Sequence, residues 1–188
     1  MQKGKLVCLV GAVVLAGVAV AAALDTPVAD AAMGRDIELV RSLIDGGADV
    51  NTARGDGMTG LHWAAKNGDR EMAGVLLDAG ADLAAVTRIG GHTPLHVAST
   101  AGRDSVVSVL VESGADVNAF TVTGATPLHF AAASGSSSAV AFLLAHGADP
   151  DAPEPQWGQT PLAFAAASGR ADAIEVLLDG GADWRIPA

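Results

Sequence analysis

Apolar and small residues recur along the chain in short runs with helical spacing, and glycine and polar residues separate the runs. Residues 93–102 illustrate the pattern: Thr93 can cap the first free backbone N–H groups of a helix, and Pro94 occupies the first helical position. Gly102 can adopt the left-handed conformation that ends a helix. Residues 105–111 resume the apolar pattern, and Gly114 ends it in the same way. The pattern therefore predicts two short antiparallel helices.

This pattern occurs five times in the chain. A Gly-Ala-Asp triplet recurs at 47–49, 80–82, 114–116, 147–149 and 181–183, and a tetrad similar to Thr-Pro-Leu-His begins at Thr26, Thr59, Thr93, Thr126 and Thr160. Successive tetrads are 33, 34, 33 and 34 residues apart, which is the fixed period of a repeat array. Such an array has no single closed core, so its function is expected on an extended surface.

Stacking of the units must supply the stability, because isolated helices of this length are marginal in water. Alanine pairs such as Ala64-Ala65, with Ala98-Ser99 at the same place in the third unit, allow helices to approach closely, and leucine pairs such as Leu76-Leu77 provide aliphatic filling. About eight polar and turn-forming residues then lead from each Gly-Ala-Asp to the next tetrad, which predicts a projecting hairpin. The extra residue of each 34-residue step falls in these connections, at 83–92 and 150–159, where loop length is tolerated best.

The repeats resemble the ankyrin-repeat family. The matching features are Thr93-Pro94-Leu95-His96, Thr126-Pro127-Leu128-His129, the alanine pairs, the glycines between the two helices of a unit, and Gly-Ala-Asp-Val-Asn at 47–51 and 114–118. The resemblance covers residues 25–184 and implies an all-α solenoid, a stack of about five helix-turn-helix units with β-hairpin fingers. It places an ankyrin-repeat domain at 24–188, with repeats at about 25–55, 56–88, 89–121, 122–155 and 156–188.

Three tetrads depart from the family pattern. Thr59-Gly60-Leu61-His62 lacks the proline, Thr160-Pro161-Leu162-Ala163 lacks the histidine, and Thr26-Pro27-Val28-Ala29 lacks both the leucine and the histidine. We therefore expect a looser helix start at Thr59 and terminal units that are adapted as caps.

The first residues differ from the repeats. Lys3 and Lys5 precede an uncharged run over residues 6–24, and Ala21 and Ala23 offer a cleavage site, so residues 1–23 are predicted to be a secretory signal peptide. The alternative is an uncleaved membrane anchor, because nineteen apolar residues reach the lower limit for spanning a bilayer. Either way the repeats are predicted to be exported: periplasmic or secreted, or anchored to the inner membrane and facing outward, as suits a bacterial envelope. Cleavage would remove Cys8, the one cysteine, and leave a chain that suits an oxidising compartment.

Acidic residues dominate the charge of the chain. It carries 21 Asp and Glu and 11 Lys and Arg, a net charge of −10. A cut after residue 23 would leave nine basic and 21 acidic residues, a net charge of −12. Such a surface repels phosphate backbones and anionic lipid, which argues against a nucleic-acid partner.

Recurring histidines and aspartates are the candidate chemical groups. His62, His96 and His129 lie one unit apart, and stacked units would separate them by about 10 Å, too far for a shared metal with bonds of ~2 Å. By the resemblance these histidines form hydrogen bonds between adjacent units, while His146 is expected to interact with the carbonyl end of its helix. The aspartates of the Gly-Ala-Asp triplets are predicted to form turns.

No catalytic motif is present in the repeats. They contain no glycine-rich phosphate loop after a strand, no nucleophile elbow and no thiol, so we predict no enzyme activity, cofactor or metal. A small-molecule or catalytic role in the envelope would require a concave pocket with convergent polar groups and a perturbed acid or base, and the sequence shows no such cluster.

The residues that break the repetition at expected exposed positions are the candidates for partner binding. By the resemblance they lie in the fingers and on the concave face that ankyrin proteins use to bind partners, with charged residues in the second unit giving way to apolar and aromatic ones; the alternative is that they pack against a neighbouring finger. The candidates are Arg54, Asp56, Met58, Lys66, Asn67, Arg88, Ile89, His92, Phe120, Val122, Trp157 and Gln159.

Other aromatic residues are expected to be structural. Trp63, Phe130 and Phe164 follow the tetrad and are predicted to be core, and Trp184 is expected to cover the open end of the stack. The sequence thus predicts a monomeric exported scaffold or adaptor that binds another protein noncovalently. The sequence does not identify that protein, and a membrane is a partner only if residues 1–23 remain attached.

Overall fold

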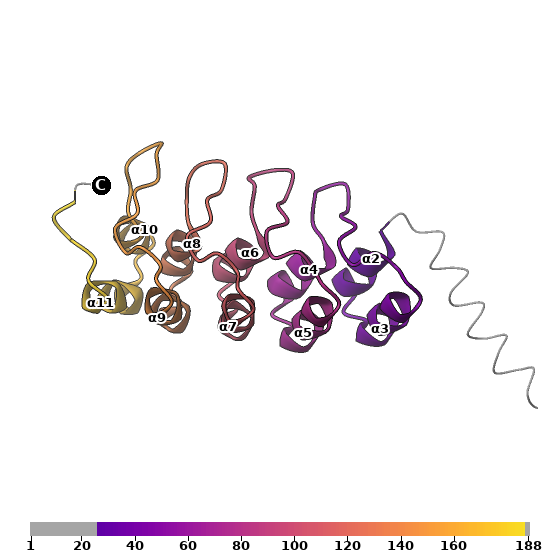
Figure 1. The fold of residues 1–188 in the computed structure, drawn as a ribbon. Helices are drawn as coiled ribbons and strands as arrows, with labels where there is room; N and C mark the ends of the chain where they lie inside the picture. The colour runs from indigo at the N-terminus through magenta and orange to yellow at the C-terminus, as the bar shows by residue number, and fades with distance from the viewer. Residues whose placement is uncertain (1–25, 187–188) are drawn as a thin grey trace, which may run out of the picture.

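The repeats form an elongated stack of helices in two layers (Figure 1). This computed structural model describes residues 26–186, so the predicted signal peptide lies outside the described residues. The inner layer consists of α2 (Pro27–Met33), α4 (Gly60–Asn67), α6 (Pro94–Thr100), α8 (Pro127–Ser134) and α10 (Pro161–Ala167). The outer layer consists of α3 (Ile37–Asp45), α5 (Arg70–Asp78), α7 (Asp104–Glu112), α9 (Ser137–Ala145) and α11 (Ala171–Asp179).

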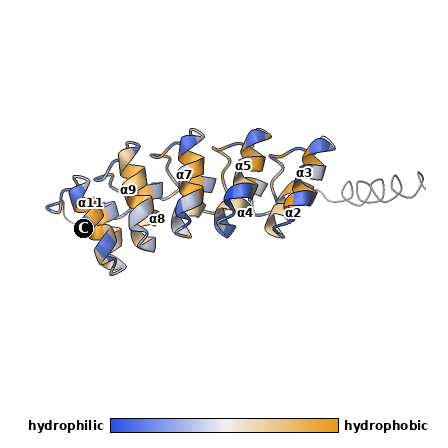
Figure 2. Ribbon diagram, turned by 90° about the horizontal axis from the view of Figure 1, so that it is seen from below, coloured by the Kyte–Doolittle hydropathy of each residue, from blue (hydrophilic) through white to orange (hydrophobic). Residues whose placement is uncertain are grey.

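The hydrophobic core runs along the whole stack between the two layers. Each inner helix contacts the next inner helix, and from α5 to α11 each outer helix contacts the next outer helix. Leu61, Leu95 and Leu128 of the inner layer are fully buried, as are Leu76, Leu110, Leu143 and Leu177 of the outer layer. Hydrophobic residues concentrate in the helices, and hydrophilic ones at the helix ends and in the loops (Figure 2). The predicted all-helical repeat stack is therefore confirmed.

Threonine and histidine together start the inner helices. At Thr59, Thr93 and Thr126 the threonine side chain accepts from the backbone three residues later, and the histidine there accepts from the threonine N–H. The expectation of a looser helix start at Thr59 is wrong, because its tetrad forms the same capping box as those at Thr93 and Thr126. The reason is that both capping groups belong to Thr59 and His62, so the missing proline removes no hydrogen bond.

A left-handed residue separates the two helices of each unit. Gly102 has φ +61°, as predicted, and the equivalent Gly68, Gly135 and Gly169 are also left-handed. The first unit has Arg35 at this position, with φ +61°. A side chain in this conformation is strained, so the first turn is the least favourable of the five.

Four loops, here called fingers 1 to 4, join each outer helix to the next inner helix. They span residues 46–59, 79–93, 113–126 and 146–160 and project from one edge of the stack (Figure 1). The β-hairpin part of the prediction is not confirmed, because the described residues contain no β-strand. Each finger is instead closed by a backbone N–H to carbonyl bond of 2.9–3.0 Å, from Arg54 to Met58, Thr87 to His92, Thr121 to Ala125, and Glu154 to Gln159.

The longer fingers have their extra residue in the segment between the two residues of the closing bond. The bonded residues are four apart in fingers 1 and 3, and five apart in fingers 2 and 4. The predicted location of the two extra residues is therefore confirmed, and the longer steps leave the helices unchanged.

Backbone hydrogen bonds also join neighbouring fingers. The Arg88 N–H donates to the Asp56 carbonyl (2.8 Å), and the Val122 N–H donates to the Gly90 carbonyl (3.0 Å). The equivalent donor position in finger 4 is Pro155, which has no N–H. Fingers 1 to 3 are thus linked in series, and this link stops before finger 4.

The last unit leaves its end open. Trp184 is 70% exposed, and the Arg185 guanidinium lies 5.4 Å from the centre of its ring. The expectation that Trp184 covers the end of the stack is therefore not borne out, because most of this ring remains exposed to solvent beside the Arg185 guanidinium. Within residues 26–186, no helix has the length and apolar character needed to cross a bilayer.

Candidate partner-binding surface

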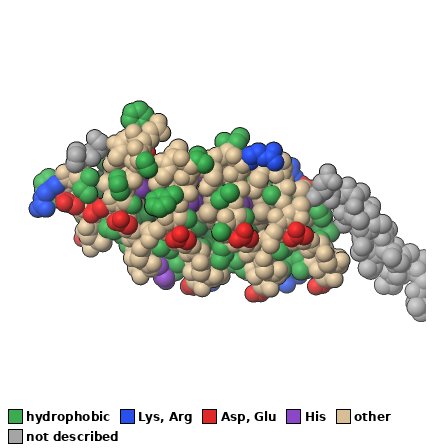
Figure 3. All heavy atoms as spheres, turned by 45° about the horizontal axis from the view of Figure 1, so that its top comes forward, with side chains coloured by type: hydrophobic (Ala, Val, Ile, Leu, Met, Phe, Trp, Pro, Cys, Tyr) green, Lys and Arg blue, Asp and Glu red, His purple; other side chains and the backbone are tan. Residues whose placement is uncertain are grey.

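The candidate binding residues lie on the fingers and on the last turn of α4. Four of them carry large, exposed apolar side chains: Ile89 (85% exposed), Phe120 (66%), Val122 (76%) and Trp157 (70%). In Figure 3, hydrophobic side chains are visible at the finger edge of the molecule and across the face below it. Exposed apolar side chains on a rigid stack are a recurrent feature of binding surfaces.

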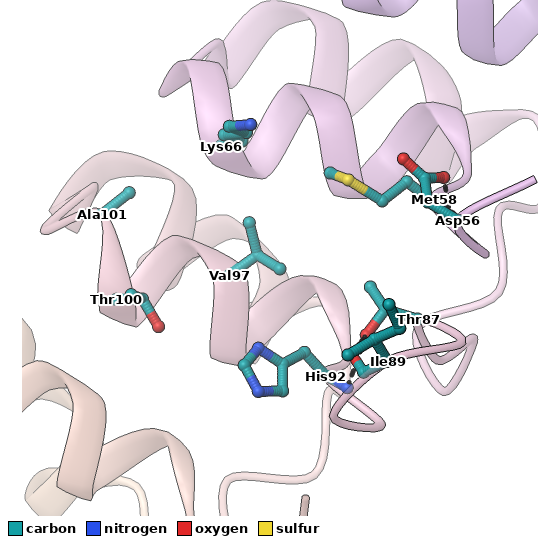
Figure 4. Close-up of a pocket in the computed structure, with 9 residues that line it drawn as sticks. All are labelled: Asp56, Met58, Lys66, Thr87, Ile89, His92, Val97, Thr100 and Ala101. Carbon is teal, nitrogen blue, oxygen red and sulfur yellow. Dashed lines mark hydrogen bonds between the residues drawn. The ribbon is translucent and has the colours of Figure 1, made fainter. Parts of the chain in front are cut away.

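Five candidates meet at one groove of about 390 Å³ between the second and third units. Its walls comprise the candidates Asp56, Met58, Lys66, Ile89 and His92, together with Thr87, Val97, Thr100 and Ala101. Figure 4 shows Val97 at the centre of this group, with Lys66 of α4, the finger residues, and Thr100 and Ala101 at the end of α6 around it. The structure therefore brings together residues that are up to 45 positions apart in sequence.

Two further candidates line a second groove of about 530 Å³ between fingers 3 and 4. Phe120 and Val122 contribute to it from finger 3, and Pro155 and Gln156 form its other side. Trp157, also on finger 4, is the next residue after Gln156. The apolar candidates of the later units are thus grouped near one another, whereas the sequence showed only that their chemistry changes along the array.

The remaining candidates have contacts within the protein. Arg54 of finger 1 forms an ion pair with Asp30 of α2, and the Asn67 side-chain amide of α4 donates to the Ala32 carbonyl of α2 (3.3 Å), so both side chains tie their segments to α2. Arg88 is exposed, and the backbone carbonyl of Gln159 accepts from His129 Nε2 (3.1 Å). Arg54 and Asn67 therefore have structural roles in addition to any role at the surface.

The three tetrad histidines bond between adjacent units, as predicted. Their Nδ1 atoms accept from threonine backbone N–H groups at 3.1–3.2 Å, so the proton is on Nε2. His62 Nε2 donates to the His92 carbonyl (2.9 Å), and His96 Nε2 lies 3.1 Å and 3.2 Å from the carbonyls of Ala119 and Ala125. Each histidine thereby fixes the base of the following finger.

Burial keeps these imidazoles neutral. It lowers the pKa of His62, His96 and His129, that of His96 to about 4, because the charged form is poorly solvated inside the stack. Burial also lowers the pKa of His92. Its ring packs against Phe130, with the ring centres 5.3 Å apart. The groove therefore presents an uncharged imidazole at neutral pH.

The aromatic residues that follow the tetrads are less buried than predicted. Trp63, Phe130 and Phe164 are half-buried and not part of the fully buried core, although Trp63 packs against it. Successive helix residues point about 100° apart, so the residue after a buried histidine turns toward the surface. Val97 occupies the equivalent position and lines the groove, and Lys66 Nζ lies over the Trp63 ring, 4.8 Å from its centre.

The predicted roles of the aspartates and of His146 are confirmed. Asp49, Asp82, Asp116, Asp149 and Asp183 each accept from the backbone N–H two residues later, at 2.8–3.0 Å. His146 Nδ1 lies 2.8 Å from the Phe142 carbonyl at the end of α9. Over residues 26–186 there is no group of three or more His, Cys, Asp or Glu residues that could hold a metal ion.

Three residues that organise the fingers were missed by the sequence reasoning. Thr87 Oγ1 and Thr121 Oγ1 accept from the backbone N–H of His92 (3.0 Å) and Ala125 (3.1 Å). Buried Glu154 accepts from the N–H groups of Gln156 (2.9 Å) and Trp157 (2.6 Å). A signal was present, since the three residues occupy equivalent positions before the finger tips.

Comparisons with known proteins agree with this architecture. A family model described as ankyrin repeats (3 copies) matches residues 28–121 and again residues 121–187. Proteins named potassium channel AKT1 from Oryza sativa subsp. indica and subsp. japonica are each 50% identical over 48 residues. That segment is 26% of this chain and 5% of the channel, so the match concerns a small part of those proteins.

Proposed function

The chain belongs to the ankyrin-repeat family, a family of general protein–protein interaction modules, and we propose that it acts as an exported scaffold or adaptor that binds another protein noncovalently. The row of exposed apolar side chains at Ile89, Phe120, Val122 and Trp157 carries this proposal. The helix stack, the backbone links between fingers 1 to 3 and, in finger 4, the hydrogen bonds of Glu154 hold these side chains in place before binding, so little conformational entropy is lost on association.

Export is the second part of the proposal. Its support is the sequence of residues 1–23, with two lysines before an uncharged apolar run. N-terminal sequencing of the exported protein tests it: a start between Ala22 and Asp25 supports a released protein, and an intact Met1 supports a membrane-tethered scaffold with the same binding face. Retention of the chain in the cytoplasm would contradict both forms.

The binding surface is tested with the double variant Trp157→Ala and Phe120→Ala. Because both rings are mostly exposed, the helical circular dichroism and the Tm should stay nearly unchanged. Capture of a partner from the native compartment should weaken by about tenfold or more, since aromatic residues are frequent binding anchors.

Leu178→Ala is the matched control, because Leu178 is an exposed apolar residue on the outer helix α11. A large fall in Tm for the double variant would show that the two rings are structural. Unchanged capture would show that the partner binds elsewhere.

A further inference from the structure

We infer that the groove between the second and third units receives one large apolar side chain of an extended polypeptide segment, and that a carboxylate close to it in the same segment pairs with Lys66. This inference rests on the proposed protein-binding function and specifies the chemistry that the partner presents.

The size and walls of the groove fit an apolar anchor. Its volume of about 390 Å³ lies toward the lower end of the range for ligand-binding clefts. Met58 and Val97 form the apolar centre, and Ile89 stands at the edge, 85% exposed. A large aliphatic or aromatic side chain inserted here would cover Ile89 and remove apolar surface from water on both partners.

Two charged side chains at the groove determine which charged group of the partner can lie beside its apolar side chain. Lys66 and Asp56 lie on different parts of its wall in Figure 4, Lys66 toward the end of α4 and Asp56 on finger 1. Among residues 26–186 neither forms an ion pair. Lys66 is exposed and lies over Trp63, so its ammonium group is held beside the groove.

The other polar groups of the groove are already engaged or uncharged. The Thr100 hydroxyl donates to the His96 carbonyl (2.8 Å), and the Thr87 hydroxyl donates to the Ile89 carbonyl (2.8 Å). His92 is neutral at neutral pH because burial lowers its pKa. Asp56 Oδ1 accepts from the Met58 N–H (2.9 Å), so the Asp56 carboxylate is already partly engaged. Lys66 is therefore the group that selects a carboxylate of the partner.

The surroundings favour a polypeptide segment as the occupant. The groove is a surface groove and not a closed cavity, and the next inner helices, α6, α8 and α10, contain no charged residue. A chain that leaves the groove can continue along this uncharged face without desolvating further ions. The second groove, with Phe120 and Val122, lies on the following fingers.

A library of random twelve-residue peptides displayed on phage and selected on the full chain tests this inference. Enriched peptides should share a large aliphatic or aromatic residue with Asp or Glu within about four positions, the reach of a side chain beside the groove. A synthetic peptide of the consensus sequence then serves as the probe for affinity measurements.

Two matched pairs of variants locate the peptide. Ile89→Asp should weaken binding by about tenfold, whereas Val86→Asp, on the same finger but outside the groove, should not change it. Lys66→Glu should weaken binding similarly and should be rescued by a peptide with Lys in place of its acidic residue. Arg70→Glu, an equal charge change on the outer helix α5, should have no effect.

The outcomes separate this inference from the proposed function. Selected peptides that are insensitive to Ile89→Asp and Lys66→Glu, or the selection of no peptide, would overturn the anchor. The proposed function would still stand if the native protein captured a partner through Trp157 and Phe120. Failure of both experiments would contradict both.

Discussion

At the scale of single residues, a residue that departs from the repeat can make its unit less stable than the equivalent units. Ser99 is fully buried in α6, and within the described chain its hydroxyl has no hydrogen-bond partner. The equivalent residues Ala65 and Ala132 are fully buried alanines. A buried hydroxyl without a partner loses its hydration and gains nothing in return, so Ser99 is the clearest locally unfavourable choice in the core.

Ser99→Ala should therefore stabilise the protein. The expected gain is about 1 kcal/mol in the free energy of unfolding, measured by urea denaturation, because the substitution removes an unpaired polar group. Alanine already packs at the equivalent positions of other repeats, so it should also fit at position 99. Ser134→Ala is the control, since the Ser134 hydroxyl donates to the Ala131 carbonyl (2.8 Å) and its loss should not stabilise. A less stable Ser99→Ala variant would show that the hydroxyl has a partner in solution.

At the scale of elements, one side chain organises the tip of each of fingers 2, 3 and 4. Glu154 is only 3% exposed, and its two carboxylate oxygens accept from the N–H groups of Gln156 and Trp157. These bonds fix the direction of the chain just before Trp157. Finger 4 thus depends on a buried carboxylate where fingers 2 and 3 depend on a threonine hydroxyl.

Glu154→Ala should loosen finger 4 and leave the stack folded. We expect faster hydrogen exchange of the Gln156 and Trp157 amides by at least about tenfold, because both lose their acceptor. Helical circular dichroism should change little, since the helices of the stack retain their contacts. Glu112→Ala, at the exposed end of α7, should leave these amides unchanged; unaltered exchange in Glu154→Ala would show that the closing bond to Gln159 alone holds the finger.

At the scale of the whole molecule, the buried histidines couple the stability of the stack to pH. Burial lowers the pKa of His62, His96 and His129 in the folded state, whereas an unfolded chain has ordinary values near 6.5. The unfolded state therefore binds more protons below about pH 6.5. The stabilisation is complete above this pH and is lost as the pH falls toward the folded-state values.

The free energy of unfolding should fall between pH 6.5 and pH 4. His96 alone, with a pKa of about 4, should account for about 3 kcal/mol of this loss when the pH is below its folded-state value. Urea denaturation at a series of pH values measures the loss. His96→Gln should be less stable at pH 7 and show a shallower dependence; equal stability of the natural chain at pH 5 and pH 7 would contradict the prediction.

The sequence predicted the stack because its signals are local and repeated. Threonine caps, left-handed glycines and buried leucines can be recognised within one unit, and the same signals recur in similar form along the five units, so they all predict the same pair of helices. The grooves could not be predicted in this way, because they form between units: Met58, Ile89 and Val97 meet only after two units have stacked. The half-buried positions of Phe130 and Phe164 were misjudged for a different reason: the helix period turns the residue that follows the buried tetrad histidine, or its equivalent, toward the surface.

Pro155 has a consequence for what can be built on this scaffold. Because it cannot donate a hydrogen bond, finger 4 has no backbone tie of the kind that joins fingers 1, 2 and 3. Extra sequence placed at the tip of finger 4 would break no such tie, whereas the same insertion at Arg88 or Val122 would. The fourth finger is therefore the site at which a grafted recognition loop or a reporter group can be added to the chain at the least cost to its neighbours.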